Sequence, residues 1–198
     1  MASLITAREL TRSYGSRTLF DGLSLTISEG DRVGVIGPNG AGKTTMLRIL
    51  SGAEEPDDGE LHRRRRLRVA MVTQDDVFES AATVVEVVTR SAALETESIE
   101  DETERQVRVA ITLEQLGFQS PEQPVAELSG GWRKRLAIAA ALAADPEVLL
   151  LDEPTVGIDP QARLNILEVI REVAKAGTTV LYTTHYMDEA EELCDRIA

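Results

Sequence analysis

The feature that most constrains the fold is the segment GPNGAGKT, residues 37–44, which contains three glycines. It follows the apolar run RVGVIG, a predicted buried strand, and it precedes KTTMLRILSG, where apolar spacing predicts a helix that ends near Gly52. Glycines let successive backbone N–H groups converge on one anion, and the start of a helix adds partial positive charge. A strand, a glycine-rich loop and a helix in this order predict a phosphate-binding unit of a parallel α/β sheet.

The residue types in this loop are those of a nucleoside triphosphate site. Lys43 is placed to reach the outer phosphates, and the hydroxyl of Thr44 can ligate Mg²⁺. The alternative is a glycine-rich turn without a ligand, which does not account for the flanking strand and helix. The predicted nucleotide-binding residues of the loop are Gly37, Asn39, Gly40, Ala41, Gly42, Lys43, Thr44 and Thr45.

A second apolar run, residues 148–151, leads directly into Asp152 and Glu153. Ligands of a parallel sheet lie beyond the carboxyl ends of its strands, so we expect both carboxylates close to the phosphates that Lys43 holds. Asp152 would hold Mg²⁺ directly or through water, and Glu153 would orient and polarise an attacking water molecule. The alternative, that two acids merely cap the strand, leaves the fully apolar run before them unexplained.

The rest of the chain completes an α/β pattern. Residues 23–28 alternate like a half-buried antiparallel strand, whereas residues 83–116 carry helical and acidic signals. Later segments alternate between predicted strands and helices: strands at 67–73 and 178–184, and helices at about 132–144, 160–176 and 187–194. In the helix at 160–176, Leu164, Leu167, Ile170 and Val173 recur at helical spacing, which predicts its buried face. We expect a phosphate-loop core with a RecA-like parallel sheet, an antiparallel β subdomain and a helical subdomain.

The domain organisation predicted from this pattern is a single domain. Residues 1–82 and 146–198 would form the core with the β subdomain, and residues 83–145 the helical subdomain. A further strand would be natural after the last residue, so the sequence favours a truncated carboxyl terminus. With 42% hydrophobic residues, a chain of 198 residues can bury a substantial core.

Composition excludes several classes of function. The net charge of −13 opposes nonspecific binding to nucleic acid, so no DNA partner is expected. One cysteine and two histidines allow no internal disulfide and no metal cluster built from side chains alone. No apolar run approaches the roughly 20 residues that cross a bilayer, so we expect a cytoplasmic protein, peripheral to a membrane or ribosome through a partner. The arginine-rich run 63–68 and the acidic run 95–104 are interpreted as solvated surface, the alternative being a local basic patch.

Five motifs occur in a fixed order along the chain. They are the glycine-rich loop, Gln74 after a strand, LSGGW at 128–132, VLLLDEP at 148–154, and His185 after VLYTT. This set resembles the ATP-binding cassette (ABC) ATPases over nearly the whole chain, and Ser129 lies 23 residues before Asp152. The resemblance implies binding and hydrolysis of ATP with Mg²⁺.

The resemblance also implies roles within one cassette. Tyr14 resembles the aromatic residue that stacks on adenine, the alternative being an ordinary aromatic of a strand. Gln74 resembles the residue that approaches Mg²⁺ and the attacking water and links the core to the helical subdomain. His185 resembles the histidine that contacts the γ-phosphate and supports Glu153. The predicted catalytic residues are therefore Glu153, His185 and Gln74, and the predicted metal ligands are Thr44, Gln74 and Asp152.

Other motifs imply a second cassette. Ser129, Gly130 and Gly131 resemble the signature that closes over the γ-phosphate of ATP bound to another cassette. Asp159 resembles the aspartate of the loop that crosses the dimer interface, and it also fits a helix cap. Since the chain has one phosphate loop and one signature, we expect a head-to-tail pair, either a homodimer or a pair with a partner cassette. Trp132 departs from the family pattern, since glutamine is commonest there in transporters.

The two parts of the chain resemble different subfamilies. Residues 1–154 resemble the first cassette of ABC-F proteins, which act on the ribosome, whereas residues 155–198 resemble an export-type transporter cassette. We interpret this as a chimera joined within DEPT, residues 152–155, the alternative being an unusual natural family. The favoured function is an ABC-F-like translation factor cassette or an engineered chimera of it, with residues 63–68 as a candidate RNA contact. The alternative is the nucleotide-binding subunit of an ABC exporter, docked on a membrane subunit.

Overall fold

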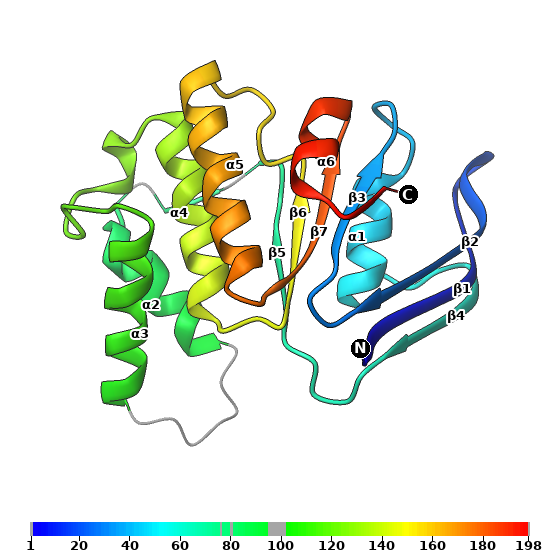
Figure 1. Ribbon diagram of the computed structural model, residues 1–198, viewed down its shortest axis with the longest axis horizontal. Coiled ribbons are helices and arrows are strands. Elements are labelled where there is room, and N and C mark those ends of the chain that lie inside the picture. Colours follow the sequence, from blue (N-terminus) through cyan, green and yellow to red (C-terminus); the bar gives the residue numbers. More distant parts are fainter. Residues whose placement is uncertain (1, 76, 80, 95–101, 198) are drawn as a thin grey trace.

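The computed structural model describes residues 2–75, 77–79, 81–94 and 102–197 (Figure 1). At its centre is a five-stranded sheet with the order β5-β6-β7-β3-β8, in which every neighbouring pair is parallel. Its strands are β3 (Arg32–Ile36), β5 (Val69–Val72), β6 (Val148–Asp152), β7 (Thr179–Thr184) and β8 (Arg196–Ile197). This confirms the predicted parallel core.

A second, three-stranded sheet lies to one side, at the right of Figure 1. It has the order β2-β1-β4 and is antiparallel throughout. Its strands are β1 (Ser3–Tyr14), β2 (Arg17–Ser28) and β4 (Asp58–Arg63). The alternation predicted for residues 23–28 is confirmed, since Leu25 and Ile27 are buried on the inner face of β2.

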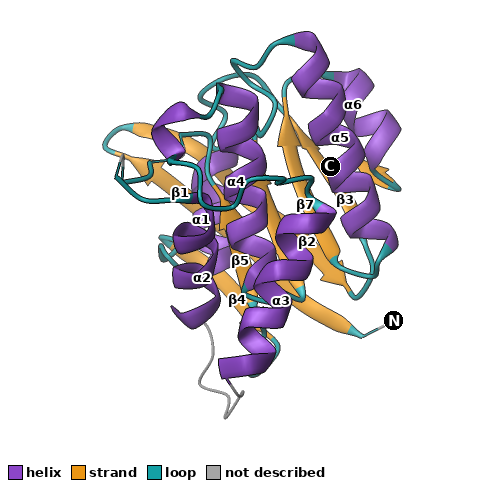
Figure 2. Cartoon of the chain, turned by 90° about the vertical axis from the view of Figure 1, so that its left-hand side faces the viewer, coloured by secondary structure: helices purple, strands orange, loops and turns teal. Residues whose placement is uncertain are grey.

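Helices cover both faces of the parallel sheet. Figure 1 shows α1 between the two sheets and α5 and α6 on the opposite face, with α2 and α3 farthest from the antiparallel sheet. Figure 2, turned by 90°, shows α2, α3 and α4 grouped on one side of the molecule. The helices are α1 (Lys43–Ser51), α2 (Val84–Leu94), α3 (Glu102–Gln115), α4 (Gly130–Ala143), α5 (Pro160–Lys175) and α6 (Met187–Leu193), with a short 3₁₀ helix at Val125–Glu127. Within the described ranges, no helix is both long and apolar enough to cross a membrane.

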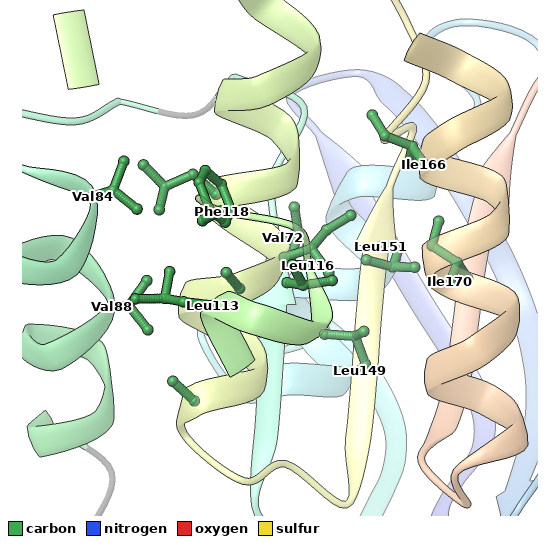
Figure 3. Packing of buried hydrophobic residues seen from close by; sticks show 14 of the residues in the cluster. Val72, Val84, Val88, Leu113, Leu116, Phe118, Leu149, Leu151, Ile166 and Ile170 are labelled. Atoms are coloured by element: carbon green, nitrogen blue, oxygen red, sulfur yellow. The ribbon is translucent and has the colours of Figure 1, made fainter. Parts of the chain in front are cut away.

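Strand β6 separates two hydrophobic cores. Leu149 and Leu151 point into the core shared with α2, α3, α4 and α5, part of which Figure 3 shows. Val148 and Leu150 point into the core shared with α1 and the antiparallel sheet. All four side chains are fully buried, because a strand covered on both faces must be apolar on both. Complete burial fixes the position of the strand whose end carries Asp152 and Glu153.

Two sequence expectations were wrong in detail. The helix predicted from residue 132 begins at Gly130, because the side chain of Ser129 accepts a hydrogen bond from the backbone N–H of Trp132 and so caps the helix earlier. Leu164, expected on the buried face of the next helix, is 58% exposed, and Ile166 packs into the core in its place. The run 95–104 falls mostly outside the described residues, since only 102–104 are described, at the start of α3.

Candidate nucleotide-binding site

The glycine-rich loop joins β3 to α1 in a conformation that requires glycine. Gly40 and Gly42 have φ values of 78° and 96°, in the left-handed region that side chains disfavour. A Cβ atom at Gly42 would also lie 3.1 Å from the Cβ of Leu19. The backbone N–H of Ala41 donates to the carbonyl of Pro38 at 3.1 Å, which tightens the loop ahead of the helix. The loop therefore brings the amino terminus of α1 to the carboxyl edge of the sheet, where an anion is favoured.

Lys43, the first residue of α1, lies at this edge and contacts both the loop and Glu153. Its Nζ donates to the carbonyls of Gly37 and Pro38, at 2.6 and 3.1 Å, and lies 2.8 Å from Oε1 of Glu153. Both charged side chains are less than 10% exposed. Thr45 is buried within α1, and Ala41 and Gly37 belong to the loop around the ammonium group. A buried ammonium group that already attracts oxygen atoms is well suited to bind phosphate oxygens.

Glu153 stands directly after β6 in a strained backbone conformation. Its φ is 45°, unusual for a residue other than glycine, and such strain persists where surrounding contacts enforce it. Its N–H donates to Oγ1 of Thr183 at 3.0 Å, and the Thr183 hydroxyl lies 3.1 Å from Oδ1 of Asp152. Thr183 thus holds two residues of the candidate site, and sequence reasoning missed it. It is found only from the pairing of Asp152 with Thr183 across β6 and β7.

His185 follows β7 and completes a row of three charged or titratable groups. Its Nδ1 lies 3.6 Å from Oε2 of Glu153, whose other oxygen contacts Lys43. The ring of His185 packs on the ring of Tyr186, with the centroids 4.0 Å apart. The structure therefore brings together three residues that the sequence placed at the phosphate-binding edge: Lys43, Glu153 and His185.

A cavity of about 220 Å³ opens beside these groups. Its lining residues are Asn39, Gly40, Lys43, Thr44, Gln74 and Glu153. Gln74 is held there from the helical side, because Nζ of Lys134 donates to the carbonyls of Thr73 and Gln74 at 2.7 and 2.9 Å. Lys134 belongs to α4, the helix that begins with the LSGG motif. No sequence signal pointed to it, since only tertiary packing brings α4 to Gln74.

The donor set in this cavity fits Mg²⁺ accompanied by phosphate. Thr44 and Gln74 offer hydroxyl and amide oxygens, which are hard ligands of the kind that Mg²⁺ prefers. Asp152 is 1% exposed and its Oδ1 is bonded to Thr183, so its carboxylate lies behind the cavity wall. Over the ranges that the structure describes, no cluster of three or more His, Cys, Asp or Glu residues could hold a metal alone. Such a site would hold the ion only together with substrate oxygens.

Tyr14, the predicted adenine-stacking residue, lies apart from the cavity at the end of β1. Its side chain is 48% exposed, and its hydroxyl donates to Oε1 of Glu54 at 2.6 Å. The guanidinium of Arg12 lies 5.1 Å from the centre of its ring and pairs with both Glu54 and Asp57. The hydrogen bond from Tyr14, supported by Arg12, lowers the pKa of Glu54 below its ordinary value. The ring of Tyr14 is therefore held in place and still exposed.

The residues predicted to face a second cassette also lie outside the cavity. Ser129 and Gly130 are exposed at the start of α4, and none of the described lining residues comes from this segment. Gly131 is buried against α5, where an added Cβ would lie 2.5 Å from the Cβ of Ala162. The helix-cap role of Asp159 is confirmed, since its Oδ1 accepts from the N–H of Ala162 at 3.0 Å. Its role at a dimer interface stays a prediction.

Part of the arginine-rich run is engaged within the chain. Arg64 forms an ion pair with Glu147, and Arg68 pairs with both Asp145 and Glu147. Arg63 donates to the carbonyl of Ser51. These contacts give the arginines a structural role at the surface and add nothing to the RNA-contact interpretation.

Comparison with known proteins places these features in one family. The model of the family described as "ABC transporter" matches residues 20–156. The Nod factor export ATP-binding protein I of Ralstonia nicotianae is 41% identical over 207 residues, covering 98% of this chain and 63% of that protein. The protein of the same name from Sinorhizobium fredii is 39% identical over 202 residues, covering 95% of this chain and 57% of that protein. This chain thus spans less than two thirds of the length of these relatives.

Solved structures agree with this similarity. An ATP-binding cassette solved as a dimer in a post-hydrolysis state with ADP and Pi has a TM-score of 0.83 and 26% identity, over 96% of this chain and 91% of that one. The cbiO1 protein of Clostridium perfringens, described as part of an ABC transporter complex, has a TM-score of 0.85 and 29% identity, over 100% and 84%. The second similarity extends over the full length of this chain, which shows that its fold is that of an ABC cassette.

Proposed function

This chain belongs to the ABC transporter family of ATPases, and from that premise we propose that it is the ATP-hydrolysing subunit of a membrane exporter. The observation that carries the proposal is the continuity of the similarity. A single export ATP-binding protein matches this chain at 41% identity, and the match covers 98% of this chain, on both sides of residues 152–155. Our interpretation of the sequence favoured an ABC-F cassette or a chimera. Neither finds support in the comparisons, which favour the exporter alternative.

The chemistry proposed for the site follows from the row of groups at the sheet edge. Lys43 would bind outer phosphate oxygens of ATP, in exchange for part of its present contact with Glu153. Glu153 would then orient the attacking water and accept its proton, while His185, 3.6 Å away, would keep the carboxylate aligned. Bound Mg²⁺, held by Thr44 and Gln74, would neutralise negative charge on the phosphate oxygens.

A second cassette is part of this proposal. Ser129 and Gly130 are exposed at the amino terminus of α4, where a helix end favours an anion supplied by another molecule. A related cassette was solved as a dimer with ADP and Pi. We therefore expect this chain to work as a head-to-tail pair, in which the signature of one copy faces the phosphate loop of the other.

The decisive experiment is ATP hydrolysis by the purified chain, measured as a function of its own concentration. Turnover per chain should rise with concentration, because each site is completed by a second copy. The Glu153→Gln variant should bind ATP as well as the unchanged chain while its turnover falls by roughly 100-fold or more, since it lacks the proton acceptor. Undiminished turnover in this variant would remove Glu153 from the reaction.

The exporter assignment needs a separate test. Tagged chain should copurify with an integral membrane protein from detergent-solubilised membranes of its own cells, and should be absent from ribosomes sedimented from the same lysate. Cosedimentation with ribosomes, together with no membrane protein in the purified complex, would overturn the exporter proposal in favour of a translation factor.

A further inference from the structure

The buried carboxylate of Glu189 lies at the centre of a polar cluster behind the active edge. Glu189 belongs to α6 and is 1% exposed. Its Oε1 accepts from Oγ1 of Thr155 at 2.7 Å and pairs with Nε of Arg163 at 2.6 Å. Its Oε2 accepts from the hydroxyls of Tyr182 and Thr184, both at 2.6 Å. Each oxygen therefore has two donors, which offset the large cost of burying a charge.

Two of these partners are close in sequence to the reacting groups. Thr155 stands two residues after Glu153, and Thr184 immediately precedes His185. Thr184 also accepts from the backbone N–H of Tyr186, at 3.0 Å. The carboxylate of Glu189 thus ties the turn after β6 to the turn after β7.

A third connection runs through aromatic contacts. The guanidinium of Arg163, held by Glu189, lies 4.3 Å from the centre of the Tyr186 ring. The Tyr186 ring in turn packs on His185, with 4.0 Å between centroids. Arg163 therefore holds Tyr186 from one side, and Tyr186 supports the imidazole that faces Glu153.

We propose that Glu189 is a positioning residue, which aligns His185 with Glu153 by binding Thr155, Thr184 and Arg163 at once. Its side chain is buried and is not among the lining residues of the cavity. The kinetic part of this inference rests on the proposed ATP hydrolysis, whereas the alignment of His185 is a property of the folded chain alone.

A charged carboxylate suits this role better than a neutral group. Four donors converge on two oxygens, and an amide would replace one oxygen with a donor. The hydroxyl of Tyr182 stays protonated, because burial and the neighbouring Glu189 raise its pKa. Stability alone does not require such a cluster, since apolar residues of similar volume often stabilise an interior equally well.

The direct test is NMR of the histidine rings. The chain has two histidines, and His62 on β4 has a 67% exposed side chain, which makes it an internal reference. The Tyr186 ring should shift the ring protons of His185 upfield. In Thr184→Val, which keeps the side-chain shape but removes the donor, the His185 signals should move downfield while those of His62 stay unchanged.

A matched control lies on the same strand. Thr179, the first residue of β7, is 1% exposed, and its Oγ1 accepts from the N–H of Gly30 at 2.9 Å, at the end of the strand away from the site. Thr179→Val should leave the His185 signals in place. His185 signals that are the same in folded Thr184→Val and in the unchanged chain would overturn the proposal.

Kinetics provide a second readout. Thr184→Val and Thr155→Val should each lower kcat by roughly 10-fold while changing KM for ATP less than about twofold, because misplacement affects the reacting groups and not the phosphate loop. Glu189→Gln should retain more activity than Glu189→Ala, since the amide keeps one acceptor oxygen.

The outcomes separate this inference from the function on which it rests. If the unchanged chain does not hydrolyse ATP, the proposed function fails and the histidine signals still decide the role of Glu189. If Thr184→Val does not fold, Glu189→Gln applies the same NMR test. A kcat in Thr184→Val equal to that of Thr179→Val would also refute the positioning role.

Discussion

Two clusters of oppositely charged side chains, one at the edge of the parallel sheet and one beside the antiparallel sheet, differ in burial. In the edge cluster, Lys43 and Glu153 are 2.8 Å apart and their side chains are 7% and 8% exposed. In the sheet cluster, Arg12 pairs at 2.5 Å with Glu54 and with Asp57, and the side chains of Arg12, Glu54 and Asp57 are 20%, 18% and 42% exposed. Water therefore reaches the second cluster and screens it in part, whereas the protein must satisfy the first almost alone. We therefore expect similar short distances to have different consequences, with the buried pair more sensitive to the loss of a partner than the partly exposed cluster.

The largest effect should come from Lys43→Ala. This variant leaves Glu153 buried without its cation, so the free energy of unfolding should fall by about 3 kcal/mol and ATP binding should be lost. Urea denaturation and nucleotide binding measure the two effects. Lys175→Ala is a matched control, since Lys175 forms a 2.7 Å ion pair with Glu172 in which both side chains are more than half exposed. Equal unfolding midpoints for the two variants would contradict the contrast between buried and exposed pairs.

A smaller effect is expected from Arg12→Ala. The side chain of Arg12 is 20% exposed and that of its partner Asp57 is 42% exposed, so water screens this cluster in part. Removal of the guanidinium should therefore lower the thermal midpoint by about 2 °C. The difference from the unchanged chain should shrink further in about 1 M NaCl, where charges interact over only a few ångströms. Thermal unfolding at low and high salt measures this. A large, salt-independent loss would mean that the sheet cluster behaves like the edge cluster.

The smallest effect should be on the pH dependence of stability, to which Glu54 and Asp57 of the sheet cluster contribute. The N–H of Ser13, helped by Arg12, lowers the pKa of Asp57, as Tyr14 and Arg12 lower that of Glu54. Both folded pKa values lie below the unfolded ones of 3.8 and 4.5, so the stability they contribute is complete above about pH 5. It is lost as the pH falls through the lowered values.

A variant with Glu54→Gln and Asp57→Asn tests this dependence. The unchanged chain should be more stable than the variant at about pH 6, and the two urea midpoints should converge as the pH falls below the unfolded pKa value of 3.8 and through the lowered folded values. The other carboxyl groups are common to both chains, so the difference between the two stability curves reports mainly on Glu54 and Asp57. A constant difference over the whole range would mean that the two carboxyl groups contribute nothing through their charge.

Much of the fold could be predicted from local patterns. Three segments have patterns that reflect the local backbone conformation: the glycines of residues 37–44, the apolar run before Asp152 and the alternation of residues 23–28. The prediction was wrong where packing decided the outcome. Helical spacing could not distinguish Leu164 from Ile166 on α5, and the cap by Ser129 started α4 two residues earlier than expected.

In the candidate site, too, local patterns predicted some residues, whereas tertiary contacts alone identified others. Lys43, Glu153 and His185 each follow a strand or a loop with a recognisable pattern, and the rule that ligands lie beyond the strand ends placed them together. Thr183, Lys134 and Glu189 act through contacts between distant segments, over separations of 31, 60 and 34 residues. No pattern within one segment identifies such partners.

The sequence by itself determined which groups stand at the active edge, because strand ends and glycine-rich turns are set by neighbouring residues. Only the tertiary structure decided how those groups are held. The strain at Glu153, its 2.8 Å contact with Lys43 and the cluster around Glu189 arise when β6, β7, α1 and α6 pack together. The physical reason is that burial makes every polar contact strong and obligatory, and burial depends on all the segments that surround a residue.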